Sequence, residues 1–291
     1  MSTSDHAARS TTPAALGQLL AGLAACDVVD LTVTLAEHLP AAWPTHMPFQ
    51  RKVYNWFAAR REGQVQPVHG WRGPYQTAWL VLDEHCGTHV DAPAHFIPPP
   101  GSGLPFANDL GTRTGDKIDP RRLIGPAAVI DVTELTGQGE GGVSPEIEPG
   151  LIERWEAVNG ALTAGEIVLF RSGWDDRYQP MPDGSGYVLD PFLLQQGPGW
   201  PTPGVAALQL LLDRGVTTIG LDGVSVGSSH DGPTAHQFGL GRDMLFIELL
   251  ANLRKVPSRG AFFICLPLKI EDSSAGPARA IALVPRQSGE G

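Results

Sequence analysis

The segment HCGTHVDAPAHF, residues 85–96, contains three histidines and one aspartate within twelve positions. Gly87 and Pro93 interrupt it, and both disfavour a helix because glycine is too flexible and proline lacks a backbone N–H. The segment follows TAWLVLDE, residues 77–84, whose composition predicts a strand. We therefore expect the histidines and the aspartate to converge through a bent loop that follows a strand.

This density of imidazole and carboxylate groups indicates a metal site. Both groups are ligands for zinc or manganese, and a carboxylate such as Asp91 can bridge two ions. His85, His89 and Asp91 supply the three protein ligands that a catalytic zinc site commonly uses. The alternative is a polar surface loop with histidines hydrogen-bonded in a turn, but four candidate groups between His85 and His95 argue against it.

The rest of the chain predicts an α/β fold with a mixed sheet. Segments rich in Val, Ile and Leu, bounded by Gly, Pro or Asp, are the expected strands: 28–35, 77–84, 127–133, 166–172, 217–223, 261–270 and 278–284. Helical spacing is found in fewer places: 14–25, 152–158 and 204–215. Because strands outnumber helices, we expect a single domain with a mixed or barrel-like β core flanked by helices.

The expected domain spans residues 27–291, preceded by an N-terminal helical extension at 1–26. The Ala/Leu-rich part of this extension is predicted to be an amphipathic helix that packs on the body. The turn-rich segments 98–105 and 181–204 are predicted to be long surface loops.

Composition excludes several classes of function. With 291 residues, 42% of them hydrophobic, the chain is long enough for a substantial core. A formal net charge of -10 argues against nucleic-acid binding, and no polybasic patch suggests a membrane surface. No apolar run approaches the roughly 20 residues that a membrane span requires.

Cysteine usage predicts a cytoplasmic protein. Cys26, Cys86 and Cys265 are odd in number and widely spaced, so neither a disulfide framework nor a CxxC zinc site is expected. The segment LAGLAAC that ends at Cys26 is similar to a lipoprotein cleavage site. Gln18 in the apolar stretch and the strand-like residues that follow argue against export.

A second group of candidate ligands lies in SSHDGPTAHQFGLGRDMLFIELLANL, residues 228–253. Glu248 follows the apolar run MLFI, so it is either a buried acid or a helix-surface glutamate. A buried carboxylate is costly unless it is paired or bound to a metal. The candidates are His230, Asp231, His236, Asp243 and Glu248.

These residues carry a resemblance to a known family. HCGTHVDAPAHF resembles the HxGTHxDxPxHF signature of the cyclase-like metal hydrolases, the family of bacterial kynurenine formamidase and isatin hydrolase, and meets every fixed position. Similar features are the Trp-Pro pair at 43–44, GVTTIGLDGVSV before the second group, and the closing LPLKIEDSSAGPARAIAL. The resemblance covers nearly everything from Val28 to Val284 and implies a swivelling β/β/α fold.

The resemblance also implies the site. His85, His89 and Asp91 would bind a first metal, and His236 and Glu248 fall where formamidase-type members hold a second zinc. The implied cofactor is therefore one or two divalent ions, zinc or manganese. His95 takes the place of the catalytic histidine.

The implied reaction is hydrolysis of the C–N bond in a small amide, aryl formamide or lactam by metal-activated water, with His95 transferring the proton to the departing nitrogen. Trp43 matches an aromatic residue of the substrate pocket, and Phe96 and Ser225 are further candidates for substrate contact. The resemblance implies a homodimer or a dimer of dimers, with the apolar residues near Trp43 covering a pocket shared between chains.

Two departures from the family bear on substrate identity. Many relatives have an acidic residue where this chain has Gly227, and a Gly-Asp pair where it has Thr45 and His46. Both places lie near the expected pocket.

Two other functions remain open. GVSVG, residues 223–227, matches the G-x-S-x-G motif of serine hydrolases with Ser225 as nucleophile, but that motif needs a helix directly after the serine and GSSHDGP is a poor helix start. A non-catalytic metal-binding or ligand-binding protein is the second alternative. It would have no need for His95 as an unligated histidine beside a metal.

Overall fold

A computed structural model describes residues 13–57 and 73–286 of the chain. Its centre is a closed ring of seven strands, in the order β12-β11-β5-β7-β9-β10-β4, in which β4 pairs again with β12. An eighth strand, β1, pairs with the outer edge of β12. The strands are β1 (Cys26–Asp30), β4 (His89–Asp91), β5 (Ile124–Asp131), β7 (Ile167–Arg171), β9 (Thr218–Leu221), β10 (Leu245–Glu248), β11 (Phe262–Pro267) and β12 (Ala275–Pro285). The expected α/β fold with a barrel-like core is confirmed.

The ring has two buried faces, which explains its apolar strand sequences. Strands β5, β7, β9 and β10 run parallel to one another, and β7 and β9 are almost completely buried. Alternate residues on the ring strands, among them Val129, Leu169 and Ile247, form one apolar cluster, and the intervening residues pack in a second cluster with the helices. The site described below therefore rests on rigid, well-packed strands.

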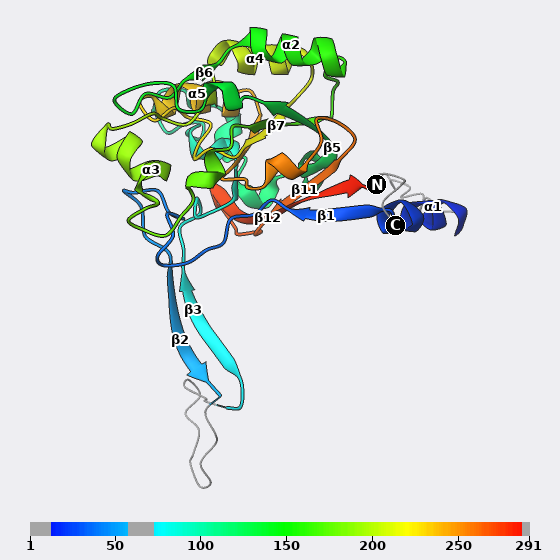
Figure 1. Cartoon of the computed structure of the whole chain (residues 1–291). Helices are drawn as coiled ribbons and strands as arrows, with labels where there is room; N and C mark the ends of the chain where they lie inside the picture. The colour runs from blue at the N-terminus through cyan, green and yellow to red at the C-terminus, as the bar shows by residue number, and fades with distance from the viewer. Residues whose placement is uncertain (1–12, 58–72, 287–291) are drawn as a thin grey trace, which may run out of the picture.

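Helices cover one side of the ring, as Figure 1 shows for α2, α4 and α5. They span Pro149–Asn159 (α2), Val205–Asp213 (α4) and Gly232–Leu240 (α5), with a short α3 at Ser185–Val188. The two predicted helices in this set, 152–158 and 204–215, are present with slightly different ends. Helix α5 was not predicted, because GPTAHQFGL contains two glycines and a proline. Pro233 is tolerated at the start of the helix, and the Asp231 side chain accepts a hydrogen bond from Thr234 N.

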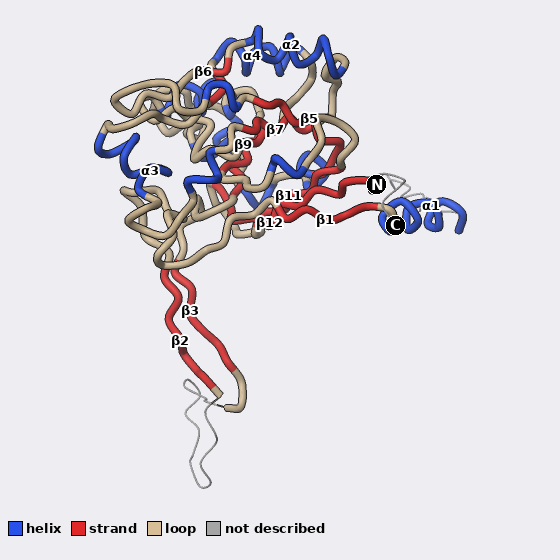
Figure 2. Tube along the Cα trace, viewed as in Figure 1, coloured by secondary structure: helices blue, strands red, loops and turns tan. Residues whose placement is uncertain are grey.

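A two-stranded hairpin projects from the body as an arm (Figures 1 and 2). It consists of β2 (Gln50–Trp56) and β3 (Gln76–Val81), which pair only with each other. The prediction of a strand at 77–84 is therefore correct for most of its length, but its placement directly before the metal segment as part of the core is wrong. The exposed side chains of Trp56, Phe57 and Trp79 lie on this arm.

Helix α1 (Pro13–Ala24) does not pack on the body, contrary to the prediction. Its apolar side chains Leu16, Leu19, Leu20 and Leu23 are exposed. Figure 1 places the helix at the outer end of β1. Residues 1–12 of the predicted extension lie outside the described residues.

The segment 181–204 is not a simple surface loop. It contains α3 and a π-helical turn, Leu189–Leu194, and it buries Tyr187 and Trp200 completely. Its remaining short strand, β8 (Thr202–Pro203), pairs with β6 (Glu146–Ile147). Short 3-10 helices lie at Pro93–His95 (η1), Asp109–Thr112, Gly115–Lys117, Pro120–Leu123, Thr133–Leu135, Trp174–Arg177 and Leu253–Lys255.

Within residues 13–57 and 73–286, no helix combines the length and the apolar character needed to cross a bilayer.

Candidate metal centre

Strand β4 carries the centre of the site and closes the ring. It lies between β10 and β12 and pairs antiparallel with both. His89 and Asp91 are two residues apart on this strand, so their side chains point to the same face. The expectation of a bent loop for these two residues is wrong, because β4 is a strand. His85 precedes the strand and His95 lies in η1 after it.

The second group of ligands comes from other elements. Glu248 is the last residue of β10 and is directly opposite His89 in the strand pairing, so it is a buried acid and not a helix-surface glutamate. His236 lies on α5, is also buried, and has the Phe96 ring stacked on it with ring centroids 4.4 Å apart. The fold thus brings together residues that are far apart in the sequence.

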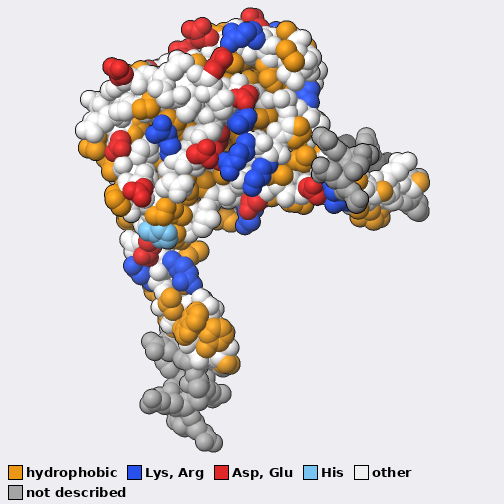
Figure 3. Space-filling model, viewed as in Figure 1, with side chains coloured by type: hydrophobic (Ala, Val, Ile, Leu, Met, Phe, Trp, Pro, Cys, Tyr) orange, Lys and Arg blue, Asp and Glu red, His pale blue; other side chains and the backbone are white. Residues whose placement is uncertain are grey.

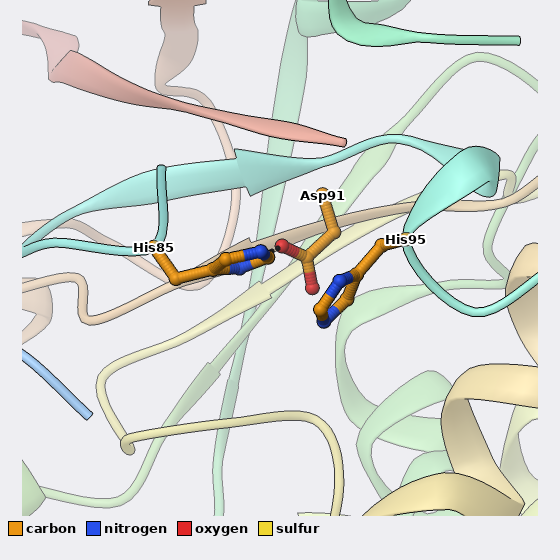
Figure 4. A group of neighbouring side chains, drawn as sticks. All are labelled: His85, Asp91 and His95. Atoms are coloured by element: carbon orange, nitrogen blue, oxygen red, sulfur yellow. Dashed lines mark ion pairs between the residues drawn. The ribbon is translucent and has the colours of Figure 1, made fainter. Parts of the chain in front are cut away.

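The side chains meet around the two carboxylates. His85 Nδ1 and His89 Nε2 lie 3.0 and 3.3 Å from Asp91 Oδ1. His236 Nε2 lies 3.5 Å from Asp91 Oδ2 and 3.3 Å from Glu248 Oε1. Figure 4 shows the His85 ring directed at the Asp91 carboxylate, with His95 beside it.

These nitrogen and oxygen atoms lie close together but do not form hydrogen bonds with one another. His89 Nε2 and both carboxylate oxygens of Asp91 are buried without a hydrogen-bond partner in the described part of the chain. Their distances are those of ion pairs, but their directions do not form hydrogen bonds, as expected for atoms that point at a shared centre. Buried polar atoms without partners are costly, so the donor set fits a bound cation.

Two overlapping sets of ligand atoms could hold an ion. One contains His85, Asp91 and His95, and the other contains His89, Asp91 and Glu248. Atoms within each set lie within 4.8 Å of one another. Asp91 belongs to both sets, which suits a carboxylate that bridges two ions.

Backbone carbonyls orient two of the histidines. His89 Nδ1 lies 2.8 Å from Gly87 O, and His236 Nδ1 lies 2.8 Å from Gly232 O. A carbonyl oxygen can only accept, so Nδ1 carries a proton, and Nε2 is the ring nitrogen that lies beside the carboxylates. Contacts of this kind fix the tautomer of metal-binding histidines.

In the absence of metal, the pKa values of the clustered side chains differ strongly from their ordinary values. Burial opposes protonation of His89 and His236, but the nearby carboxylates of Asp91 and Glu248 raise the pKa of each histidine to about 10. Burial also opposes ionisation of Asp91, yet the surrounding histidines hold the pKa of its carboxyl well below the usual range. Without metal, the positive charges of protonated histidines therefore compensate the negative charges of the carboxylates. A bound cation would take over this role and displace the protons from the histidines.

His95 differs from the other histidines. Burial lowers its pKa to about 3, against the attraction of Asp91, so the ring is neutral. Its centroid lies 4.0 Å from that of His85 and 5.6 Å from that of His236. The geometry places His95 at the cluster both as a candidate ligand and as the predicted proton-transfer residue.

An apolar cavity of about 250 Å³ opens onto the cluster. Trp43, Phe96 and Phe192 form its aromatic wall, and the Trp43 and Phe192 rings have centroids 4.3 Å apart. The predicted pocket residues Trp43 and Phe96 are thus placed at the cavity of their own chain. Phe192 was not predicted, since nothing in the turn-rich segment 181–204 distinguishes it.

Ser225 lies at the same cavity but has no histidine partner in the described residues. Its Oγ donates to Glu248 Oε1 over 3.1 Å and accepts from Gly227 N over 3.0 Å. No helix follows it until α5 begins at Gly232. These contacts disfavour Ser225 as a nucleophile, because a serine hydrolase needs a base within hydrogen-bond reach.

Gly227 is enclosed by its neighbours. A Cβ on Gly227 would lie 2.6 Å from Gly232 O and 2.8 Å from His236 Cε1. An acidic residue therefore cannot be accommodated here without moving α5.

Three of the candidate ligands lie outside the cluster. His230 Nδ1 accepts a hydrogen bond from Ser144 N, and Asp231 caps α5. Asp243 forms ion pairs with Arg113 and Arg122.

Comparisons with known proteins show which proteins this chain is similar to. A family model described as a putative cyclase matches residues 29–228. The isatin hydrolase of Roseibium aggregatum is 37% identical over 216 residues, which cover 72% of this chain and 74% of that protein. The kynurenine formamidase of Sphingopyxis alaskensis is 30% identical over 213 residues, which cover 72% of this chain and 80% of that protein. The solved structure of isatin hydrolase A from Ralstonia solanacearum has a TM-score of 0.75 at 30% identity and covers 95% of this chain and 100% of that chain.

Proposed function

The chain belongs to the cyclase family, and from this premise we propose that it is a metal-dependent hydrolase that cleaves the C–N bond of a small amide, aryl formamide or lactam. One observation carries the proposal. His89, which lines an apolar cavity of about 250 Å³, and Asp91 beside it carry buried ligand atoms without hydrogen-bond partners in the described residues. A cavity of this size suits a small aromatic molecule, and the cluster suits zinc or manganese.

We assign the metal to His85, His89, Asp91, His236 and Glu248, as one or two ions per chain. When bound, such an ion lowers the pKa of water to near 7 and polarises a carbonyl oxygen. The buried position of the cluster supports this assignment, since a dry surrounding strengthens electrostatic contacts. Asp91 would bridge two ions, because its two oxygens face different histidines.

The other side chains at the cavity have separate roles in proton transfer, substrate binding and support of the ligands. His95 lines the cavity beside His85, and this position supports a role in transferring a proton to the departing nitrogen. Trp43 and Phe96 provide apolar surface for an aromatic ring. Ser225 holds Glu248 Oε1 in place through its hydroxyl and contributes to the cavity wall.

Hydrolysis of a substrate panel tests the proposal. Isatin, an N-formyl aryl amine and a simple cyclic imide are incubated with chelator-treated protein, alone and with zinc or manganese restored. We expect at least one substrate to be hydrolysed only after metal is restored. No hydrolysis of any of them, or hydrolysis that chelation does not affect, would contradict the proposal.

We also propose that the protein assembles as a homodimer or a dimer of dimers. The arm exposes Trp56, Phe57 and Trp79, and hydrophobic side chains gather towards its outer described end in Figure 3. A lone two-stranded hairpin is marginally stable in water, and a contiguous apolar surface favours a protein partner. Light scattering of the wild type and of Trp79→Asp tests this, and a fully active wild-type monomer would refute it.

A cytoplasmic location is part of the same proposal. Cys26, Cys86 and Cys265 are all free thiols in the structure. Free thiols persist in a reducing compartment.

A further inference from the structure

His46 is a histidine at the cavity that belongs to neither ligand set. It follows the Trp-Pro pair in a turn, in which its backbone N–H donates to Trp43 O over 2.9 Å. Its ring lines the same cavity as His85, with ring centroids 6.1 Å apart. His46 is therefore a half-exposed side chain of the cavity wall on the side of His85.

Asp83 fixes the orientation of this ring. Asp83 Oδ1 lies 3.2 Å from His46 Nδ1 and accepts a second hydrogen bond from His85 N over 2.9 Å. One carboxylate oxygen thus ties the Trp-Pro turn to the first residue of the metal segment.

Asp83 Oδ1 already accepts from the His85 N–H, and a proton on His46 Nδ1 lets the same oxygen accept from the ring as well. The other nitrogen, Nε2, has no hydrogen-bond partner among the described residues. In the neutral ring, Nε2 is an acceptor. His46 consequently offers an oriented acceptor at the cavity wall.

The two serine hydroxyls at the cavity already take part in hydrogen bonds. Ser225 Oγ donates to Glu248, and Ser228 Oγ accepts from Asp231 N. The aromatic wall of Trp43, Phe96 and Phe192 has no acceptor to offer except ring faces. In an amide or lactam, the nitrogen that carries the N–H is bonded directly to the carbonyl carbon. A carbonyl group that meets the cluster therefore brings this N–H to the cavity wall.

We propose, building on the proposed function, that His46 is a specificity-determining residue whose Nε2 accepts a hydrogen bond from the N–H of the scissile amide. Asp83 acts on specificity only through His46 and is a positioning residue. The site therefore selects secondary amides and N-unsubstituted lactams over their N-alkylated forms. A site built to hydrogen-bond a substrate N–H discriminates against the analogue without it, because its own polar group is left unpaired.

The test compares isatin with N-methylisatin, each assayed at pH 8 with the metal-loaded full chain. The ring fixes the amide geometry, so the methyl group removes the donor without changing the amide conformation. Each kcat/KM is divided by the rate constant for hydrolysis by hydroxide alone, which removes the intrinsic difference in reactivity. The measured quantity is the ratio of these two normalised values.

We expect the wild-type ratio to favour isatin by about tenfold or more, the size of one lost hydrogen bond. His46→Phe keeps the ring shape and should bring the ratio close to one, mainly by slowing isatin. His46→Gln restores a polar group near the Nε2 position and should recover part of the preference. His38→Phe, an exposed histidine that does not line the cavity, should keep the wild-type ratio.

The ratio is measured on two substrates with one preparation, so partial loss of metal or of folded protein does not change it. An unchanged preference for isatin in His46→Phe would assign the discrimination to the shape of the cavity and overturn the inference. Equal normalised rates in the wild type would overturn it while leaving the proposed function intact. If the protein hydrolyses neither isatin nor N-methylisatin, and no member of the substrate panel, both this inference and the proposed function are refuted.

Discussion

Glu248 and His89 are directly opposite each other in the antiparallel pairing of β10 with β4, with His89 Nε2 3.5 Å from Glu248 Oε2. The register of two backbone strands therefore sets this contact, and no flexible loop intervenes. A one-residue slip of β4 would turn His89 and Asp91 to the other face of the sheet. The closure of the ring by β4 is thus the feature that positions both carboxylates of the site.

Loss of one ligand should remove metal. We expect His89→Ala to lose most of the divalent metal that the wild type retains after reconstitution and desalting, because His89 Nε2 is buried and has no other partner in the described residues. The measurement is elemental analysis per folded chain. His230→Ala is the matched control, since His230 lies near α5 but bonds to Ser144. Equal metal content in His89→Ala and wild type would contradict the ligand assignment.

Activity and metal content should separate at His95. We expect His95→Ala to keep its metal while its turnover falls by roughly 10²-fold or more, the usual size of a general acid–base contribution. Both quantities are measured on one sample. His95 also lies within ligand distance of His85 and Asp91, so the metal content of the variant distinguishes a metal ligand from a proton-transfer residue. Metal lost together with activity would make His95 a ligand.

The motif could be predicted from the sequence because its ligands are local. HCGTHVDAPAHF has its polar groups fixed within twelve positions. The strand pair that brings Glu248 to His89 was not predicted, because neither β4 nor β10 is among the expected strands. His236 was a candidate on the resemblance, although α5 itself was missed. Its glycines and Pro233 conceal a helix that tertiary contacts and the Asp231 cap stabilise.

The arm and the pocket wall could not be predicted in the same way. The strand at Gln76–Val81 has the composition of a core strand, and only its pairing with β2 alone reveals that it projects outward. Composition reports that a side chain is apolar, but not whether a second surface covers it. Phe192 reaches the cavity through a π-helical turn that has no sequence signature.

Ser225→Ala distinguishes the two hydrolytic mechanisms. We expect kcat/KM to fall by no more than about tenfold, because the change removes one hydrogen bond to Glu248 while Val226 N continues to donate to the same oxygen. A nucleophilic serine would instead lose about 10⁶-fold. Mass spectrometry of the wild type during turnover is the second measurement, and a covalent adduct on Ser225 would overturn the metal mechanism.

Trp43 should contribute to substrate affinity but not to metal binding. Its ring packs on Phe192 and lines the cavity, and it makes no contact with the ligand atoms. We expect Trp43→Ala to raise KM for an aromatic substrate roughly tenfold, with metal content unchanged, and Trp43→Phe to retain most of the affinity. Steady-state kinetics with elemental analysis checks this. An unchanged KM in Trp43→Ala would exclude this tryptophan from the substrate contact.

The helices on the ring are tied together by an ion pair with a clear pH dependence. Glu156 on α2 accepts from Arg214 at the end of α4, with Oε1 3.0 Å from Nε and Oε2 3.1 Å from Nη2. The hydrogen bonds from Arg214, against slight burial, lower the pKa of Glu156 below its ordinary value of 4.5. Its folded-state pKa is therefore lower than its unfolded-state pKa, so ionised Glu156 stabilises the fold above about pH 4.5 and this contribution is lost as the pH falls through the lowered value.

Glu156→Gln should reduce the free energy of unfolding at pH 7 by up to about 1 kcal/mol, because the pair is solvent-screened, and the difference from wild type should shrink as the pH falls from 4.5 towards 3. Glutamine retains an acceptor for Leu162 N, so the change mainly removes the charge. Urea unfolding at several pH values measures the difference. Glu153→Gln, an exposed change on the same helix, controls for net charge. A destabilisation by Glu156→Gln that stays constant across this range would show that shape or hydrogen bonding, and not the ionised carboxylate, stabilises the α2–α4 contact.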